Sequence, residues 1–355
     1  MATPSDFRPR GRYAIRSLPS GALGLAWEPP MPRLPDENLE VIFYLYPDTE
    51  AAEKAEQAGG CGFFLNWPFA RDNQNHLYAV TNRHIIHDGH WTMRITNLLD
   101  GKSIIIDTDD SKWFPHPNGD DLSIFLVDFP MVFQCKASPP RALITHDVIA
   151  EHAIGIGDDV FTVGRFTNHD GKLRNNPSVR FGNIAQMPIE PILQRNGHLQ
   201  ESFLCECRSV SGYSGSPVYV DLPSWSARPN KEGIQSRPIG RWLLGVNWGH
   251  LNDWKPVCDA LGNAVATGYQ VGMNSGMMGV VPAWKLREML EHPEMVERRR
   301  KREDDVLGKA PPISSFDSAP RKKGEVPIVP EPDNPAHKED FTALLGEAAT
   351  KQRSA

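Results

Sequence analysis

Short runs of apolar and β-branched residues, separated by turn residues, recur between residues 39 and 281. Each run has the length and composition of a β-strand bounded by turn signals. Six runs precede a polar break at residues 128–150: Leu39–Tyr46, Cys61–Asn66, His76–Thr81, Trp91–Thr96, Ser103–Asp107 and Leu122–Val127. Six more follow it: Asp159–Gly164, Ser178–Met187, Ser202–Arg208, Pro217–Val220, Trp242–Trp248 and Met277–Val281. This pattern predicts an all-β chain of antiparallel strands, either two barrels or a sandwich.

The pattern becomes helical after the last strand. Pro282 stands where a first helical turn tolerates proline, and Pro293 is a stop signal. Between them, the apolar residues fall on one side of a helix: Trp284, Leu286, Met289 and Leu290. We therefore expect a first strand domain at residues 36–130, and a second one with this C-terminal helix at residues 131–292.

The two ends of the chain show no strand pattern. Residues 1–35 carry five Arg, two acidic residues and many Pro and Gly, which predicts an extended arm. Residues 293–355 contain a basic run at residues 298–302 and continue Pro-rich and charged, a composition typical of disorder. Within this tail, the segment 338–350 has apolar residues at helical spacing. It is either a frayed end or a peptide that docks in a partner's groove.

Composition narrows the class of protein. The chain has 355 residues, 40% of them hydrophobic and 23% charged, as expected of a globular protein. The net charge of −6 argues against nucleic acid as a partner. Five cysteines leave at least one unpaired, which favours a reducing compartment. Since no secretory signal or membrane-length apolar run is visible, we expect a cytoplasmic protein without membrane contact.

The candidate chemistry begins at the run Gly212–Pro217, which reads Gly-Tyr-Ser-Gly-Ser-Pro. The glycines on either side of Ser214 predict a tight turn with room for a substrate carbonyl. The backbone N–H groups of Gly212 and Ser214 can point at one place and hold an oxyanion. A serine hydroxyl is a weak nucleophile until a base takes its proton, so the motif requires a histidine elsewhere.

Two upstream segments supply that histidine and an acid. His84 follows a predicted strand, and Asp121 stands directly before another, in the order His, Asp, Ser. With the Gly-x-Ser-Gly-Ser-Pro run, these segments resemble the chymotrypsin-fold (trypsin-like) serine peptidases of the bacterial intracellular type. Asp121 matches the family acid because Leu122-Ser123-Ile124 follows it as an apolar-small-apolar strand. Asp120 would face the other way, and we interpret it as a solvated loop acid.

The resemblance implies more than a triad. It implies two antiparallel six-stranded β-barrels with the active site between them, plus the C-terminal helix. The strand with Asn247, Trp248 and Gly249 is similar to the one that pairs with substrate backbone in that family. Arg208 lies at the family's pocket-floor position, where it selects an acidic side chain unless it turns outward or pairs with an acid. Tyr213 departs from the secreted members, which carry Asp there and pair it with a new N-terminus.

Other interpretations remain beside this one. An α/β-hydrolase elbow is disfavoured, because Ser216 replaces its second glycine and the order of the triad differs. A zinc site is disfavoured, because His84, His87 and His90 lack a further ligand at a familiar spacing. The sequence predicts a cofactor-free serine endopeptidase that acts on protein or peptide. The alternatives are a catalytically silent peptide-binding module on the same fold and an esterase with the same triad.

Overall fold

The computed structural model describes residues 34–308, except 128–133, 168, 170, 195–196, 208–211, 223–227, 230–234, 237–239 and 266–267. The chain divides into two compact units, Met1–Lys309 and Ala310–Ala355, and every described residue belongs to the first. The predicted arm up to residue 33 and the predicted docking segment 338–350 lie outside the described residues.

The first half of the described chain is one antiparallel sheet of seven strands. Its order is β5-β4-β1-β2-β3-β7-β6, with β1 and β2 near the centre. The strands are β1 (Ile42–Tyr46), β2 (Gly60–Pro68), β3 (Asn75–Thr81), β4 (Thr92–Thr96), β5 (Ser103–Ile106), β6 (Phe114–Pro115) and β7 (Ser123–Leu126). A closed first barrel is therefore not confirmed: the sheet contains the six predicted strands and ends at β5 and β6.

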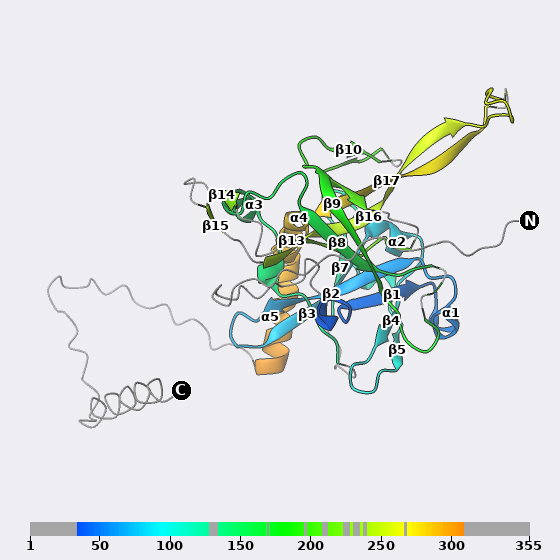
Figure 1. Cartoon of the computed structure of the whole chain (residues 1–355). Helices are drawn as coiled ribbons and strands as arrows, with labels where there is room; N and C mark the ends of the chain where they lie inside the picture. The colour runs from blue at the N-terminus through cyan, green and yellow to red at the C-terminus, as the bar shows by residue number, and fades with distance from the viewer. Residues whose placement is uncertain are drawn as a thin grey trace, which may run out of the picture. The chain divides into compact units, whose positions relative to one another are not determined.

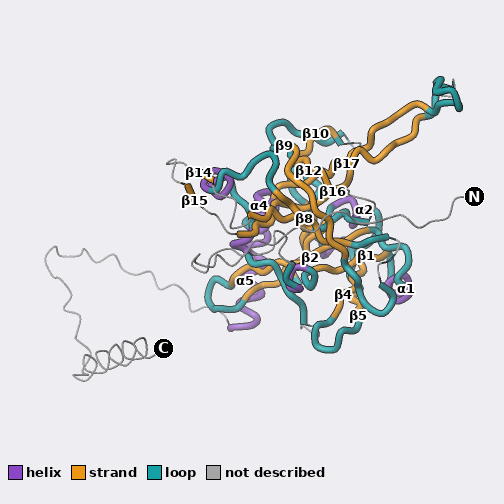
Figure 2. The backbone as a smooth tube through the Cα atoms, viewed as in Figure 1, coloured by secondary structure: helices purple, strands orange, loops and turns teal. Residues whose placement is uncertain are grey.

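The second half holds a closed six-stranded barrel, as predicted. Its order is β12-β17-β16-β13-β8-β9, and strands dominate both halves (Figure 2). The barrel strands are β8 (Asp159–Gly164), β9 (Ser178–Gln186), β12 (Phe203–Cys207), β13 (Pro217–Leu222), β16 (Gly240–Pro256) and β17 (Gln270–Pro282). Two small hairpins add β10 (Ile192–Leu193) with β11 (Leu199–Gln200), and β14 (Arg228–Pro229) with β15 (Gln235–Ser236).

The long β16–β17 hairpin extends beyond the predicted strands. Residues 250–275 look like a polar loop in the sequence, yet Asn252–Pro256 pair with Gln270–Asn274. The outer part of this ribbon runs away from the barrel (Figure 1). Trp254 and Met273 on it stay about half exposed, at 50% and 53%. Strand pairing without burial leaves no apolar alternation to read, which is why the sequence did not indicate it.

A shared core explains why the two halves stay together. Alternate side chains of β1 point to opposite faces. Phe43 and Leu45 enter a cluster under the first sheet. Tyr44 enters a second cluster that continues into the barrel through residues such as Val218 and Leu244. The first sheet is therefore buried on both faces, and the join between the halves is continuous apolar core.

Helices are few and mostly short. They are α1 (Thr49–Lys54), α2 (Arg83–His87), α3 (His146–Glu151), α4 (Ala283–Leu290) and α5 (Pro293–Leu307), with 3-10 turns at Asp36–Asn38, Asp110–Lys112 and Pro140–Ala142. The predicted C-terminal helix is α4, and it buries Trp284, Leu286, Met289 and Leu290. Among the described residues, no helix is long and apolar enough to cross a membrane.

Helix α5 corrects the predicted boundary at residue 292. Residues 293–307 are helical, and two of their charged side chains are buried. Glu303 accepts a hydrogen bond from Ala70 N–H and pairs with buried His76, both at 3.0 Å. Arg299 donates to Tyr78 Oη at 2.9 Å and to the carbonyl of Leu290 at 2.7 Å. Buried charged side chains that are satisfied by hydrogen bonds leave no apolar stripe, so composition alone suggested disorder.

Candidate active site

His84 and Asp121, predicted as base and acid, are in direct contact. His84 Nδ1 lies 2.7 Å from Asp121 Oδ2, and the backbone N–H of His84 donates to Asp121 Oδ1 at 2.9 Å. The ring sits on α2, which begins directly after Asn82 at the end of β3. Asn82 Nδ2 donates to the carbonyl of Asp121 at 2.8 Å. Both carboxylate oxygens of Asp121 are thus committed to His84, and its main chain is tied to the same turn.

The contact sets the protonation chemistry of His84. Burial lowers the pKa of this imidazole, but the hydrogen bond and the negative charge of Asp121 outweigh it, so the pKa is raised. The side chain of His84 keeps 40% of its surface exposed, while that of Asp121 keeps 10%. An imidazole with one nitrogen bonded to a buried carboxylate and the other open can accept a proton at Nε2.

Ser214 lies in a tight turn of the second half. Gly212 and Gly215 have φ angles of +97° and +81°, a conformation that favours glycine. An added Cβ at Gly215 would lie 1.9 Å from the carbonyl oxygen of Cys61, so this position has no room for a side chain. The Gly215 N–H donates to the carbonyl of Asn247 at 2.8 Å, which ties the turn to β16.

Cys61, on β2 of the first half, holds this turn from the other side. Its N–H donates to the carbonyl of Ser214 at 2.8 Å, and its thiol donates to the carbonyl of Gly212 at 3.1 Å. The N–H of Arg165 donates to the same sulfur at 3.1 Å. Thr81, three residues before His84, donates to the Cys61 carbonyl at 2.7 Å. One buried residue thus joins the serine turn to the strand that leads to the histidine.

Close packing at Gly60 brings the two segments together. A Cβ added there would lie 2.5 Å from Cδ1 of Ile85, the neighbour of His84, and 2.9 Å from the carbonyl of Ser214. Across the described residues, no hydrogen bond joins Ser214 to His84 Nε2. Such contacts often tighten only when substrate binds.

The backbone N–H groups of Gly212 and Ser214 have no acceptor among the residues that the structure describes. By contrast, the next two N–H groups of the turn, at Gly215 and Ser216, donate to the carbonyls of Asn247 and Tyr213. Two uncommitted N–H groups beside a serine can stabilise negative charge on a carbonyl oxygen.

Asp120 corrects the prediction of a solvated acid. It is only 5% exposed. Gln200 Nε2 donates to its Oδ1 at 2.9 Å, and His116 Nδ1 lies 3.2 Å from its Oδ2. His116 itself is buried, and burial lowers the pKa of its imidazole despite the nearby carboxylates of Asp120 and Glu288. The partners of Asp120 come from distant parts of the sequence, so local polarity could not reveal them.

Three of the four predicted substrate-binding residues lie along β16. Asn247 is fully buried, and its Oδ1 accepts from the Gly249 N–H at 2.8 Å. Trp248 Nε1 donates to Ser202 Oγ at 2.9 Å. A Cβ added at Gly279 would lie 2.3 Å from the Trp248 indole, so the ring lies over β17. Arg208 falls outside the described residues, and its predicted role in the choice of side chain stays a prediction.

Tyr213 anchors the serine turn in the barrel. The side chain is fully buried, and its hydroxyl is hydrogen-bonded to Ser178 on β9. The guanidinium of Arg180 stacks on the ring, 5.2 Å from its centroid. Burial raises the pKa of the Tyr213 hydroxyl, so the group stays neutral at physiological pH. The sequence showed that no acid stands here but gave no sign of this anchoring.

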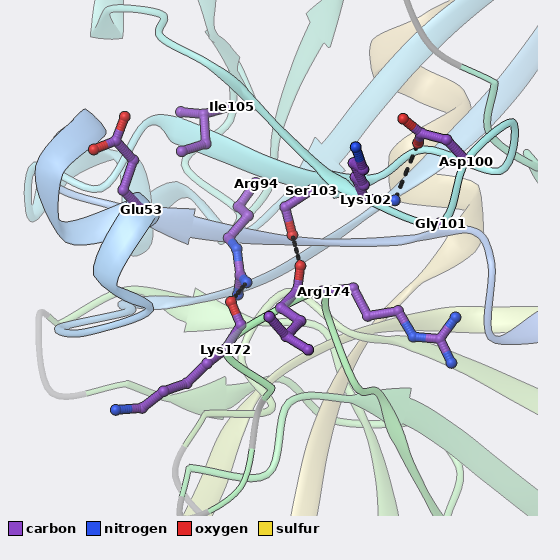
Figure 3. Close-up of a pocket in the computed structure, with 10 residues that line it drawn as sticks. Glu53, Arg94, Asp100, Gly101, Lys102, Ser103, Ile105, Lys172 and Arg174 are labelled. Atoms are coloured by element: carbon purple, nitrogen blue, oxygen red, sulfur yellow. Dashed lines mark hydrogen bonds between the residues drawn. The ribbon is translucent and has the colours of Figure 1, made fainter.

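A separate pocket of about 740 Å³ lies where β4 and β5 meet the segment 172–174 (Figure 3). Its lining includes none of the described candidate site residues. Arg94 in its wall is buried and donates to the carbonyls of Gly171 and Lys172 at 2.9 and 2.6 Å. The Arg94 guanidinium is therefore hydrogen-bonded to the main chain. Within the described ranges, no cluster of three or more His, Cys, Asp or Glu could hold a metal ion.

No protein-family model matches the chain, and no curated protein matches it. Similar solved structures include the MamO protease domain from Magnetospirillum magneticum, with 12% identity, 72% of this chain and 98% of that chain covered, and a TM-score of 0.41. Deg5 has 14% identity, coverage of 60% and 81%, and a TM-score of 0.36. The HtrA-type protease AlgW with a decapeptide has 15% identity, coverage of 68% and 59%, and a TM-score of 0.37. At such low identity and TM-score, no function follows from these similarities.

Proposed function

We propose that the protein is a serine endopeptidase in which His84, Asp121 and Ser214 form the catalytic triad. The observation that carries the proposal is the two-point contact between His84 and Asp121, at 2.7 and 2.9 Å. A carboxylate on Nδ1 fixes the tautomer in which Nε2 is free to accept a proton, which is what a general base requires. The serine turn, connected to β3 through Cys61, supplies the nucleophile.

The proposed reaction has two halves. Ser214 Oγ attacks the scissile carbonyl while His84 Nε2 takes the hydroxyl proton, and the N–H groups of Gly212 and Ser214 hold the oxyanion. The C–N bond then breaks, and the imidazolium returns the proton to the leaving amine. Water, deprotonated by His84, attacks the acyl-enzyme and releases the acid, with Ser214 protonated again. Asp121 stabilises the imidazolium in each half.

Substrate binding is proposed to involve β16. The substrate main chain would lie beside Asn247, Trp248 and Gly249, and Arg208 would favour an acidic side chain at the cleaved bond. Arg165 lies close to the turn: its N–H donates to Cys61 Sγ, and a Cβ added at Gly212 would lie 3.4 Å from its guanidinium. We propose peptides and proteins as the substrates, and the cytoplasm as the place of action.

The rival is a peptide-binding module without catalysis. It is favoured by one observation: in the described part of the chain, the Ser214 side chain makes no hydrogen bond to His84. An assay of the purified protein on a diverse peptide library distinguishes the two functions, with the Ser214→Ala and His84→Ala variants measured in parallel. If the protein is a peptidase, the wild type cleaves peptides, and kcat falls by a factor on the order of 10⁴–10⁶ in each variant. Binding without cleavage by the wild type would establish the module.

An ester substrate completes the test. Ester hydrolysis needs no protonated leaving amine, so it is the easier reaction for the same triad. An endopeptidase cleaves both substrates, and Ser214→Ala removes both activities. Ester cleavage with intact peptides would show an esterase instead.

A further inference from the structure

Asp121 has a second attachment, made through its main chain rather than its carboxylate. Its N–H donates to Oε1 of Gln200 at 2.8 Å, across 79 positions of sequence. Its carbonyl accepts from Asn82 at 2.8 Å. Gln200 is fully buried on β11, a strand of the second half of the chain. The candidate acid is therefore held from both halves of the molecule.

The Gln200 amide has a defined orientation. Its Nε2 donates to Asp120 Oδ1 at 2.9 Å and to the carbonyl of Glu201 at 3.0 Å. A flipped amide would set its oxygen against two acceptors and its nitrogen against the Asp121 N–H, and would lose every one of these bonds. The network therefore fixes Oε1 as the atom that faces Asp121.

The Asp120 carboxylate, which accepts a hydrogen bond from the Gln200 amide, is itself held in place by several neighbours. Nitrogen atoms from separate elements surround the Asp120 carboxylate: His116 Nδ1 at 3.2 Å, His198 Nε2 at 3.3 Å and the Lys285 ammonium Nζ, on α4, at 3.8 Å. Lys285 in turn lies 3.4 Å from Glu201 and 3.5 Å from Glu288. A buried carboxylate stays in place when it is paired in this way. Asp120 is thus a firm support for Gln200.

We propose that Gln200 is a positioning residue: it transmits the fixed place of Asp120 to the main chain of Asp121 and so holds Asp121 against His84. The assignment rests on the proposed function, in which Asp121 is the triad acid. Both oxygens of Asp121 bond to His84, so a small shift of its main chain lengthens two hydrogen bonds at once. Removing the Gln200 acceptor also leaves a buried N–H unpaired, which drives such a shift.

The test begins with Gln200→Met, which keeps the length of the side chain and removes every hydrogen bond. Gln186→Met is the matched control, because Gln186 is exposed at the end of β9. The first readout is the pKa of His84, followed by NMR of the imidazole without substrate. The carboxylate of Asp121 raises that pKa, so a loosened contact with Asp121 lowers it. The charge of Asp88 also raises the pKa of His84, and this contribution remains in the variant. The control leaves the pKa unchanged.

The second readout is the pH profile of kcat/KM on a peptide. His84 must be neutral to act as base, so the acid limb of the profile follows the pKa of the free enzyme. Gln200→Met moves this limb to lower pH, and the plateau falls by a factor on the order of 10–100, as expected for a misplaced catalytic group. A residue that only stabilised the fold would change neither the limb nor the plateau of the folded enzyme.

A charge exchange provides the rescue. Gln200→Glu keeps an acceptor for the Asp121 N–H but sets a second carboxylate against Asp120. Adding Asp120→Asn supplies a donor and restores the net charge of the cluster. We expect the double variant to recover at least tenfold in kcat/KM over Gln200→Glu alone, since contacting groups are coupled.

An unchanged His84 pKa in folded Gln200→Met overturns the proposal. If that variant does not fold, the exchange decides, and a double variant no better than Gln200→Glu overturns it equally. Failure of the proposed function is a separate result. Peptide cleavage that survives Ser214→Ala would refute the peptidase, while the NMR readout, taken without substrate, still reports on Gln200.

Discussion

The two sides of the candidate site are built differently. On the base side, side chains make the contacts: His84 bonds Asp121 twice, and Asn82 and Gln200 hold the Asp121 main chain. On the nucleophile side, main-chain hydrogen bonds to Cys61 and Asn247 fix the turn, together with the Cys61 thiol and the buried Tyr213 side chain. There the Gly212 and Ser214 N–H groups keep no partner in the described chain.

This difference distinguishes the groups whose hydrogen bonds are made in the free protein from the groups that are left to bind the substrate. The base side uses all its strong contacts internally, so its protonation chemistry is set in the free protein. The turn is held by hydrogen bonds, yet within the described residues its Gly212 and Ser214 N–H groups have no acceptor and can hold a developing negative charge. Preorganised donors of this kind need no rearrangement during the reaction. Substitutions on the two sides should therefore fail in distinguishable ways.

The largest effect is expected from Asp121→Asn, which breaks the base side. The amide would favour the wrong imidazole tautomer, and kcat is expected to fall by on the order of 10⁴ at neutral pH. Asp88→Asn is the matched control, because that exposed carboxylate also lies near His84. It should change kcat less than about tenfold. Steady-state kinetics on one peptide compares the two variants, and equal losses would refute the role of Asp121.

A smaller effect is expected from Cys61→Ala, which loosens the nucleophile side. It leaves the Gly212 carbonyl and the Arg165 N–H without their sulfur partner, at about 1–3 kcal/mol of stability. We expect kcat to fall by on the order of tenfold, with the acid limb of the pH profile unmoved. Cys205→Ala, in the barrel core, serves as control and should lower stability alone. A shifted acid limb in Cys61→Ala would show that the two sides are not separable.

The pH dependence of stability sharpens the comparison further. The pKa of folded His84 is raised above its ordinary value near 6.5, so the protonated ring stabilises the fold. That contribution is fully present below pH 6.5 and is lost as the pH rises through the folded pKa. Urea unfolding from pH 5.5 to 8.5 should therefore give wild type a larger advantage in stability over His84→Ala at low pH than at high pH. A difference that is constant with pH would contradict the raised pKa.

The smallest effect on activity is expected at α5, away from both sides. Glu303→Ala leaves the Ala70 N–H and buried His76 without their partner, so the free energy of unfolding should fall by about 1–3 kcal/mol. The folded Glu303→Ala variant should keep the wild-type kcat. Glu297→Ala, on an exposed part of the same helix, is the control. Chemical denaturation and kinetics test both, and a large drop in kcat would show that α5 acts on the site.

The strands and the candidate triad could be predicted from the sequence, whereas the residues that support the triad could not. Strands occupy all twelve predicted positions, because alternation and turn residues are local signals. His84 and Asp121, chosen on motif and order, lie in contact. The support around them was not predictable: Cys61 looks like an inert small hydrophobe in the sequence. Gln200 lies 79 positions from Asp121, in a two-residue strand.

Charged residues were the main source of error. A buried charge is expected only with a partner, and a partner distant in sequence leaves no trace in local composition. Asp120 and Glu303 therefore looked solvated, whereas the fold pairs both of them. The closed first barrel, which was inferred from a family resemblance, is not confirmed; the strand ladders of that half form a seven-stranded sheet.

The most direct test of the central claim is the rate at which a fluorophosphonate labels Ser214, measured by intact-protein mass spectrometry. The reagent reports activation of the hydroxyl without requiring a known substrate. We predict stoichiometric labelling of wild type at Ser214, and a rate lower by on the order of 10³ or more in His84→Ala, which retains the serine. No labelling of the wild type, or equal rates in the two proteins, would contradict the account.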